Sequence, residues 1–134
     1  MAYRKPNAFT QKVFNPIAMR FGISGTETLE VRRRRSGGTQ RVPVIPIDHD
    51  GARYIVSARG ESEWVKNLRA AGGDAELGKH GAVHRVHVSE VPVDDRTAIL
   101  ATYQKVAGKA VSSHFSALPA NRDHPVFRIE QDGA

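Results

Sequence analysis

Two turn sequences in the first half of the chain constrain its fold more than any other feature. Residues 36–39 read Ser-Gly-Gly-Thr and residues 48–51 read Asp-His-Asp-Gly, and both are typical of tight turns between antiparallel strands. Segments with strand character flank the turns at 28–34, 41–47 and 53–58. The sequence therefore predicts a meander of short antiparallel strands.

The middle segment differs from its neighbours because it contains Pro43 and Pro46. Proline has no backbone N–H to donate to an adjacent strand, so we expect this segment at an edge of the sheet or at a bulge. In the first segment, Leu29 and Val31 alternate with polar residues and are expected on the inner face.

A short helix is predicted after the third strand. Ser62 is its expected N-cap, and the glycines at 72 and 73 end it. Trp64, Leu68 and Ala71 recur at helical intervals and form its expected inner stripe.

The remaining elements are a strand pair, a longer helix and a final strand. The strands are predicted at 75–77, 82–88 and 125–129, and the helix runs from its expected cap Asp94 to Gly108. Five or six short, mostly antiparallel strands with three helices indicate an α+β domain built on a small barrel.

Besides these two helices, a third is expected at the N-terminus. Apolar residues recur at four-residue steps between Phe9 and Phe21, and Pro16 should kink the helix. We interpret residues 1–22 as an amphipathic helical segment that packs over one end of the core or, alternatively, contacts a membrane surface. Residues 1–134 are expected to form a single domain, since this length supports one core.

The composition narrows the classes of function. The chain has no cysteine, which excludes disulfide frameworks, thiolate nucleophiles and cysteine-based metal sites. No apolar run approaches the roughly 20 residues of a membrane-spanning helix. A formal net charge of +6 favours an anionic partner, which is a phosphorylated cofactor, an acidic lipid surface or nucleic acid.

The histidines and serines of the chain could suggest a metal site or a hydrolase active site. His84 and His87 differ by three positions, so on one strand they project to opposite faces and do not readily share a metal ion. Ser112, Ser113 and His114 are expected in a loop after a helix, and no motif places an oxyanion hole beside them. Neither a metal site nor a hydrolase is expected.

The strongest functional signal is the run Arg32–Arg35, which leads into a glycine-containing turn and is followed by Arg41. Guanidinium groups at both ends of this turn can converge on one anion, and the glycine N–H groups and the hydroxyls of Ser36 and Thr39 add donors. A solvated charge run is the simpler interpretation, but a bound anion would relieve the repulsion between the arginines. A cofactor phosphate and a nucleic-acid backbone would do so equally well.

A second signal covers residues 59–69. The strand ends at Arg59 before a helix N-terminus, where free N–H groups can contact an anion or a carbonyl. We interpret Trp64 as a core anchor. Asn67, on the inward face, needs a hydrogen-bond partner in the backbone or in a heterocycle.

Together the two motifs resemble the deazaflavin-dependent nitroreductases, also known as the F-420-dependent quinone reductases of mycobacteria and related actinobacteria. The resemblance rests on the arginine-rich turn with Arg41 and Pro43 after it, and on the Trp-Val-Lys-Asn-Leu-Arg sequence at 64–69, and it extends from about residue 14 to residue 129. It implies an α+β split β-barrel of the FMN-binding type, with mostly antiparallel strands and flanking helices. The implied cofactor is coenzyme F-420, a phosphorylated 8-hydroxy-5-deazaflavin with an oligoglutamate tail.

The resemblance also implies which residues bind this cofactor. The turn would hold the phosphate, the strand after it would run under the ring, the end of the third strand would lie beside ring and tail, and the helix amide would lie near the ring. The residues concerned are Arg34, Arg35, Ser36, Gly37, Gly38, Thr39, Arg41, Pro43, Val44, Ala58, Arg59 and Asn67.

The implied reaction is hydride transfer from reduced F-420 to a quinone, an enone or a nitro compound. Tyr103, Ser113, His114 or water could supply the proton that must follow, and the sequence leaves these alternatives open. Residues 112–115 stand where the nitroimidazole-activating member of the family carries several tyrosines, so its prodrug activity is not implied.

Two other functions remain as alternatives. One is an FMN-dependent oxidoreductase on the same barrel, and the other is a non-enzymatic basic module that binds nucleic acid. Aromatic residues make up only 7% of the chain and no recognition helix is evident, so no nucleic-acid partner is expected. We expect a monomer or weak homodimer in the cytoplasm, or peripherally at the inner face of the plasma membrane.

Overall fold

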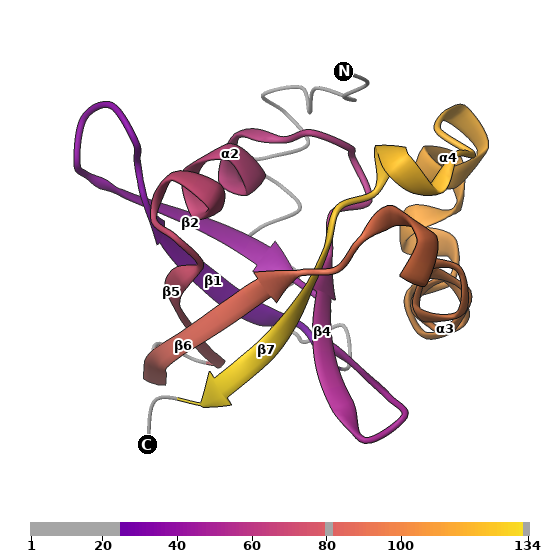
Figure 1. The fold of residues 1–134 in the computed structure, drawn as a ribbon, viewed down its shortest axis with the longest axis horizontal. Coiled ribbons are helices and arrows are strands. Elements are labelled where there is room, and N and C mark those ends of the chain that lie inside the picture. Colours follow the sequence, from indigo (N-terminus) through magenta and orange to yellow (C-terminus); the bar gives the residue numbers. More distant parts are fainter. Residues whose placement is uncertain (1–24, 80–81, 133–134) are drawn as a thin grey trace.

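Seven strands form one sheet in the part of the chain that this computed structural model describes, residues 25–79 and 82–132. The strands are β1 (Glu27–Arg32), β2 (Thr39–Val44), β3 (Ile47–His49), β4 (Ala52–Val56), β5 (Asp74–Lys79), β6 (Ala82–Glu90) and β7 (Val126–Asp132). The helices are α2 (Glu63–Ala70), α3 (Thr97–Ala107) and α4 (Lys109–Ala117). Figure 1 shows α3 and α4 together at one side of the molecule and α2 at another. The N-terminal helical segment predicted at 1–22 lies outside the described residues.

The order of the strands shows that the sheet is rolled up. It is β2-β1-β5-β6-β7-β4-β3, so β2 and β3 lie at opposite edges. Only Ile45 and Pro46 separate these two strands in sequence, and such a connection spans at most roughly 10 Å. The two edges must therefore lie close together, which makes the sheet a barrel that is split between β2 and β3. The predicted α+β split barrel of antiparallel strands is confirmed.

Proline explains where the rolled sheet breaks. One edge strand was predicted over 41–47, but β2 ends at Val44 and β3 begins at Ile47 on the other edge. Pro46 lies between them and has no N–H for a strand ladder, so the chain leaves one edge and joins the other. The edge placement is confirmed, and the single continuous strand is wrong.

Both predicted hairpin turns are confirmed. Between β1 and β2, the Arg33 N–H donates to the Gly38 carbonyl at 2.7 Å, and the Gly37 N–H donates to the Arg33 carbonyl at 3.0 Å. Gly37 has φ 79°, a left-handed value that glycine adopts without strain. Between β3 and β4, Asp50 and Gly51 have φ values of 48° and 79°, the pattern of a type I′ hairpin turn.

Buried apolar side chains form two clusters on opposite faces of the strands. In β4, Ile55 belongs to the first cluster whereas Tyr54 and Val56 belong to the second, because successive strand residues point to opposite faces. The first cluster includes α2 residues, and its members include Leu29, Val31, Ile55, Val65, Leu68, Leu77 and Phe127. The second includes residues of α3 and α4, and its members include Ile47, Tyr54, Val56, Ile99, Leu100, Tyr103, Val111 and Val126. The predicted burial of Leu29 and Val31 is confirmed.

Helix α2 begins after Ser62, as predicted, although the Ser62 side chain makes no capping hydrogen bond. Its buried residues are Val65, Asn67 and Leu68. Of the predicted stripe of Trp64, Leu68 and Ala71, only Leu68 is fully buried. The buried face is rotated toward Asn67, because the amide of this residue bonds to the β1–β2 hairpin.

Helix α3 begins later than predicted. Asp94 is not its N-cap and lies instead in a short 3-10 turn, and Arg96 occupies the N-cap position. The buried Arg96 side chain donates from Nε to the Val91 carbonyl at 2.9 Å and from Nη1 to the His124 carbonyl at 3.4 Å. These tertiary bonds fix the backbone ahead of the helix, which local capping preference does not reveal.

Helix α4 stands where a loop was expected. Gly108 ends α3, as predicted, and with φ 57° it turns the chain directly into α4. Ser112, Ser113 and His114 are therefore helical. Val111 is the only fully buried residue of α4, so its apolar pattern is too weak to identify in the sequence.

Candidate functional site

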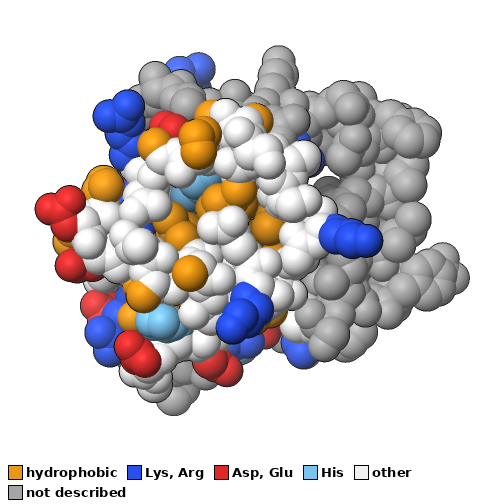
Figure 2. Space-filling view, turned by 90° about the vertical axis from the view of Figure 1, so that its right-hand side faces the viewer, with side chains coloured by type: hydrophobic (Ala, Val, Ile, Leu, Met, Phe, Trp, Pro, Cys, Tyr) orange, Lys and Arg blue, Asp and Glu red, His pale blue; other side chains and the backbone are white. Residues whose placement is uncertain are grey.

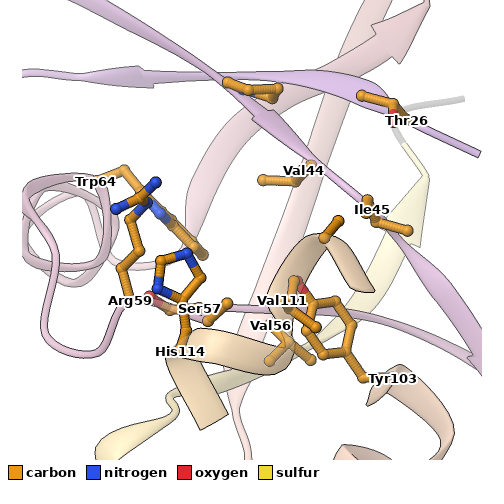
Figure 3. Close-up of a pocket in the computed structure, with 13 residues that line it drawn as sticks. Thr26, Val44, Ile45, Val56, Ser57, Arg59, Trp64, Tyr103, Val111 and His114 are labelled. Carbon is orange, nitrogen blue, oxygen red and sulfur yellow. The ribbon is translucent and has the colours of Figure 1, made fainter. Parts of the chain in front are cut away.

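An apolar pocket lies where β2 and β4 end beneath α4, and it has a volume of about 240 Å³. Figure 2 shows the side of the molecule that carries α3 and α4, where hydrophobic side chains gather centrally and charged side chains lie toward the periphery. The pocket residues are Thr26, Pro43, Val44, Ile45, Val56, Ser57, Ala58, Arg59, Trp64, Tyr103, Ala110, Val111 and His114. Figure 3 shows how they converge from the strands and from all three described helices. We call this the apolar pocket.

The polar groups of the apolar pocket are few. Arg59, Trp64 and His114 line one side of it (Figure 3). Tyr103 is only 4% exposed, and burial raises the pKa of its phenol, so the hydroxyl stays protonated at neutral pH. The Thr26 hydroxyl oxygen is buried without a hydrogen-bond partner among the described residues. An apolar site with a few polar groups is typical of small-molecule binding.

The β1–β2 hairpin forms a second, polar hollow with the last turn of α2. Its lining residues are Arg32, Arg33, Arg34, Arg35, Ser36, Gly37, Asn67, Ala70, Ala71 and Asp74. The side chains of Arg32, Arg33 and Arg35 are exposed. Within the described residues, no carboxylate lies within salt-bridge distance of these three arginines. We call this the arginine hollow, and its donors suit a phosphate or a carboxylate.

Arg34 and Asn67 join the hairpin to α2. The Asn67 Oδ1 atom accepts from the Arg34 backbone N–H at 3.1 Å and from Arg34 Nη1 at 2.8 Å, and Asn67 Nδ2 donates to Gln40 Oε1 at 2.8 Å. Arg34 Nη2 also donates to Glu63 at 2.9 Å, and this hydrogen bond holds the pKa of the Glu63 carboxyl below its usual value. The predicted partner of the Asn67 amide is therefore the hairpin itself.

Other basic groups are engaged in the same way. Arg41 Nε lies 3.3 Å from a Glu30 carboxylate oxygen, although its side chain remains 67% exposed. Arg69 bridges Glu61 and Glu90, and these two carboxylates raise its pKa through hydrogen bonds, that of Glu90 most strongly. Arg69 thus ties α2 to β6 and is not available to a ligand in this arrangement.

The structure divides the predicted site residues between the two hollows. Pro43, Val44, Ala58, Arg59, Tyr103 and His114 line the apolar pocket, and Arg34, Arg35, Ser36, Gly37 and Asn67 line the arginine hollow. Gly38, Thr39, Arg41 and Ser113 line neither of these two hollows. Ser113 is exposed on α4, which separates it from the neighbouring His114.

Strand β2 connects the two hollows. It starts at Thr39 beside the hairpin and ends at Val44 in the apolar pocket. Six extended residues place these ends roughly 17 Å apart at a rise of about 3.4 Å per residue. One elongated ligand along β2 could therefore reach both hollows.

Several lining residues of the apolar pocket were missed by sequence reasoning. They are Thr26, Ile45, Val56, Ser57, Trp64, Ala110 and Val111. Trp64 was interpreted as a core anchor, and it does pack on Phe127 with ring centroids 5.9 Å apart, but it is only half-buried and faces the pocket as well. Ala110 and Val111 belong to the helix that the sequence did not reveal.

Among residues 25–79 and 82–132, no group of three or more His, Asp or Glu side chains is arranged to hold a metal ion. His87 pairs with Asp74 at 2.9 Å. No described helix is long and apolar enough to cross a membrane.

The sequence model of a family described as F420H(2)-dependent quinone reductase matches residues 2–130. None of the curated protein sequences matches significantly.

Solved structures share the fold at low sequence identity. A structure described as an F420-H2-dependent reductase has a TM-score of 0.58 at 16% identity, covering 79% of this chain and 94% of that chain. One described as a domain-swapped dimer has a TM-score of 0.57 at 15% identity, covering 94% and 100%. A putative 5-nitroimidazole antibiotic resistance protein from Bacteroides thetaiotaomicron has a TM-score of 0.52 at 16% identity, covering 90% and 80%. These likenesses concern the fold, and they agree with the split barrel.

Proposed function

Because the chain belongs to the F420H(2)-dependent quinone reductase family, we propose that its two hollows hold the two ends of coenzyme F-420 and that the acceptor enters the apolar pocket. The protein is an oxidoreductase that uses reduced F-420. The observation that carries the proposed site is the course of β2, which leads from a cluster of exposed arginines to an apolar pocket.

The residues present suit the chemistry of this cofactor. Arg35 and the Ser36 hydroxyl offer a cationic and a neutral donor to its phosphate, and Arg32 and Arg33 offer charge to its acidic tail. Arg34 contributes indirectly, since it holds the hairpin on Asn67 and Glu63. Arg41 becomes a ligand only if it leaves Glu30, to which it is bound through one exposed contact.

The apolar pocket suits the ring and the acceptor. Pro43, Val44 and Ala58 offer small apolar surfaces from two strand ends, and Trp64 offers an aromatic face. Bound F-420 in its reduced form supplies the hydride. The chain holds ring and acceptor together in a site from which the apolar walls exclude most water.

We assign the proton donor to His114. It lines the pocket, whereas Ser113 points away from it on the same helix. Tyr103 also lines the pocket, but its raised pKa makes it a poor acid and a lasting hydrogen-bond donor. A proton from His114 would neutralise the oxygen that becomes negative as an acceptor takes up hydride.

The acceptor class follows from the shape and polarity of the pocket. Its walls are mostly apolar with a few polar groups, which suits a small planar molecule that carries a few polar atoms. Quinones, enones and nitro compounds all meet this description, and we place quinones first because of the family to which the chain belongs. A single domain over residues 1–134, a cytoplasmic location and a monomeric or weakly dimeric state stay predictions, as does membrane contact through residues 1–22.

The function is tested by mixing the full chain anaerobically with F-420H2 and menadione, a small naphthoquinone, and following oxidation of the cofactor. We expect turnover with F-420H2 and none with reduced FMN or NADH. An enone and a nitroaromatic compound in place of menadione rank the acceptor classes. Turnover with reduced FMN alone, or none with any acceptor, would contradict the proposal.

A further inference from the structure

His124 is a fully buried side chain that the proposed reaction does not use. It lies between α4 and β7 and has an exposed fraction of 0%. Its Nδ1 atom lies 3.1 Å from the Ser57 carbonyl oxygen, and its Nε2 atom faces the Leu118 carbonyl oxygen. Ser57 follows β4, and Leu118 is the C-cap of α4, so one imidazole joins two elements that are distant in sequence.

Both partners of this imidazole are hydrogen-bond acceptors. A backbone carbonyl can only accept, and a neutral imidazole carries one N–H and one lone pair. Neutral His124 would therefore place a lone pair against one of the two carbonyl oxygens. An imidazolium donates to both, which satisfies every polar atom of this buried ring.

Two neighbouring groups favour the cation. The Leu118 carbonyl is at the C-terminus of α4, where the unpaired carbonyls carry partial negative charge. The Phe115 ring stacks on the imidazole with centroids 3.9 Å apart and an interplanar angle of 11°, and an aromatic face attracts a cation. Burial of the charge opposes these effects, so satisfied hydrogen bonds on both sides are required.

Charged groups on the surrounding elements do not reverse this balance. Titratable and charged residues on or next to those elements are Arg59, Glu90, Arg96, Tyr103, Lys109, His114, Arg122 and Asp123, with Arg128 and Glu130 on β7. Arg96 donates to the His124 backbone carbonyl at 3.4 Å. It is itself paired with Glu90 at 3.2 Å, which offsets its charge.

We propose that His124 carries a proton on both ring nitrogens and is a positioning residue for α4. Ser57 lines the apolar pocket at the end of β4, and Val111 and His114 line it from α4. By holding Ser57 and Leu118 together, the imidazolium fixes the separation of these two walls and the place of His114. This role in catalysis rests on the proposed function, because it requires that α4 border the acceptor.

The protonation state is tested by NMR on the full chain labelled with ¹⁵N-histidine at neutral pH, without any ligand. We expect two slowly exchanging imidazole N–H protons that are absent from His124→Phe. A single N–H on this ring, with the other nitrogen at the shift of a lone-pair nitrogen, would overturn the proposal. His124→Gln provides the same comparison if His124→Phe does not fold.

The positioning role is tested with variants that separate stacking from hydrogen bonding. His124→Phe keeps a ring on Phe115 and removes both donors, and His124→Gln keeps a donor without the charge. We expect the KM for menadione to rise roughly ten-fold in His124→Phe, as for the loss of a charge-assisted hydrogen bond, with partial rescue in His124→Gln. The F-420 dissociation constant should stay close to that of the wild type.

The exposed His87 on β6 provides the control, since His87→Gln should leave the KM unchanged. An unchanged KM in His124→Phe would refute the positioning role. If the wild-type chain shows both N–H protons but does not bind F-420, the proposed function fails and the assignment of His124 stands.

Discussion

At the scale of single residues, the site depends on which basic and polar side chains are already engaged within the protein. Arg34, Asn67 and Arg69 all match the motif that suggested ligand binding, yet each is held by partners within the chain. Arg35 and His114 face the two hollows. The two sequence motifs lie in segments that form these hollows, and only the side-chain contacts show which of their residues are already engaged within the protein.

The role of His114 gives the first prediction. His114→Ala should lower kcat by roughly 10²- to 10⁴-fold if this side chain delivers the proton, as for the loss of a general acid. Binding of F-420 should be unchanged. Steady-state kinetics with menadione measures the effect, and Ser113→Ala, one residue away on the exposed side of α4, is the matched control. Equal kcat values for both variants would mean that water or Tyr103, and not His114, donates the proton.

Tyr103 gives a prediction about stability against pH. Burial raises its pKa above the unfolded value of about 10. Its stabilising contribution is therefore complete below about pH 10. Above this pH the unfolded chain releases the proton first, so the free energy of unfolding falls by up to about 1.4 kcal/mol per pH unit until the folded pKa is reached. Urea unfolding at alkaline pH should show a shallower loss in Tyr103→Phe than in the wild type. Parallel pH profiles would show that the phenol is not buried as described.

At the scale of elements, the conformation of the β1–β2 turn controls how its donors are presented. Gly37 has φ 79°, whereas the neighbouring Gly38 does not have a positive φ. Gly37→Ala should destabilise the chain by about 1 kcal/mol and weaken F-420 binding, because alanine is strained in the left-handed region. Gly38→Ala should be close to neutral, since its added Cβ would meet only side-chain atoms at van der Waals distance, the Ser36 hydroxyl oxygen at 3.4 Å and Arg33 Cδ at 3.9 Å.

Denaturation and F-420 titration of the two alanine variants check this prediction. Equal stability and affinity in the pair would mean that the turn does not keep its conformation in solution.

The elements also show what local sequence could predict. The hairpins were found because Ser-Gly-Gly and Asp-Gly turns favour positive φ angles, which Gly37, Asp50 and Gly51 then adopt. The start of α3 was misplaced, because buried Arg96 binds the carbonyls of Asn121 and His124, which are distant in sequence. Helix α4 was missed because its packing depends on one buried valine and on the His124–Phe115 stack, and neither leaves a periodic pattern.

At the scale of the whole molecule, the rolled sheet explains how two hollows of different chemistry lie within reach of the one ligand that we propose. The two edges of the sheet are joined by two residues, and β2 is one of those edges. Its ends therefore reach the arginine hairpin in one direction and the pocket under α4 in the other. The fold class was predictable from turns and alternation, whereas the pocket walls come from residues 26, 45, 57 and 111, which no local pattern brings together.

The central claim is that exposed arginines of the β1–β2 hairpin bind the phosphate of F-420. Fluorescence titration of the full chain with F-420 tests it most directly, comparing wild type, Arg35→Ala and Arg41→Ala with Lys105→Ala, which removes the same charge from the exposed face of α3. Loss of a charge-assisted phosphate contact should cost about 1.5–3 kcal/mol, or at least roughly ten-fold in affinity.

We predict this loss for Arg35→Ala, a smaller loss for Arg41→Ala because it must first leave Glu30, and wild-type affinity for Lys105→Ala. Wild-type affinity in Arg35→Ala, or an equal loss in Lys105→Ala, would contradict the account.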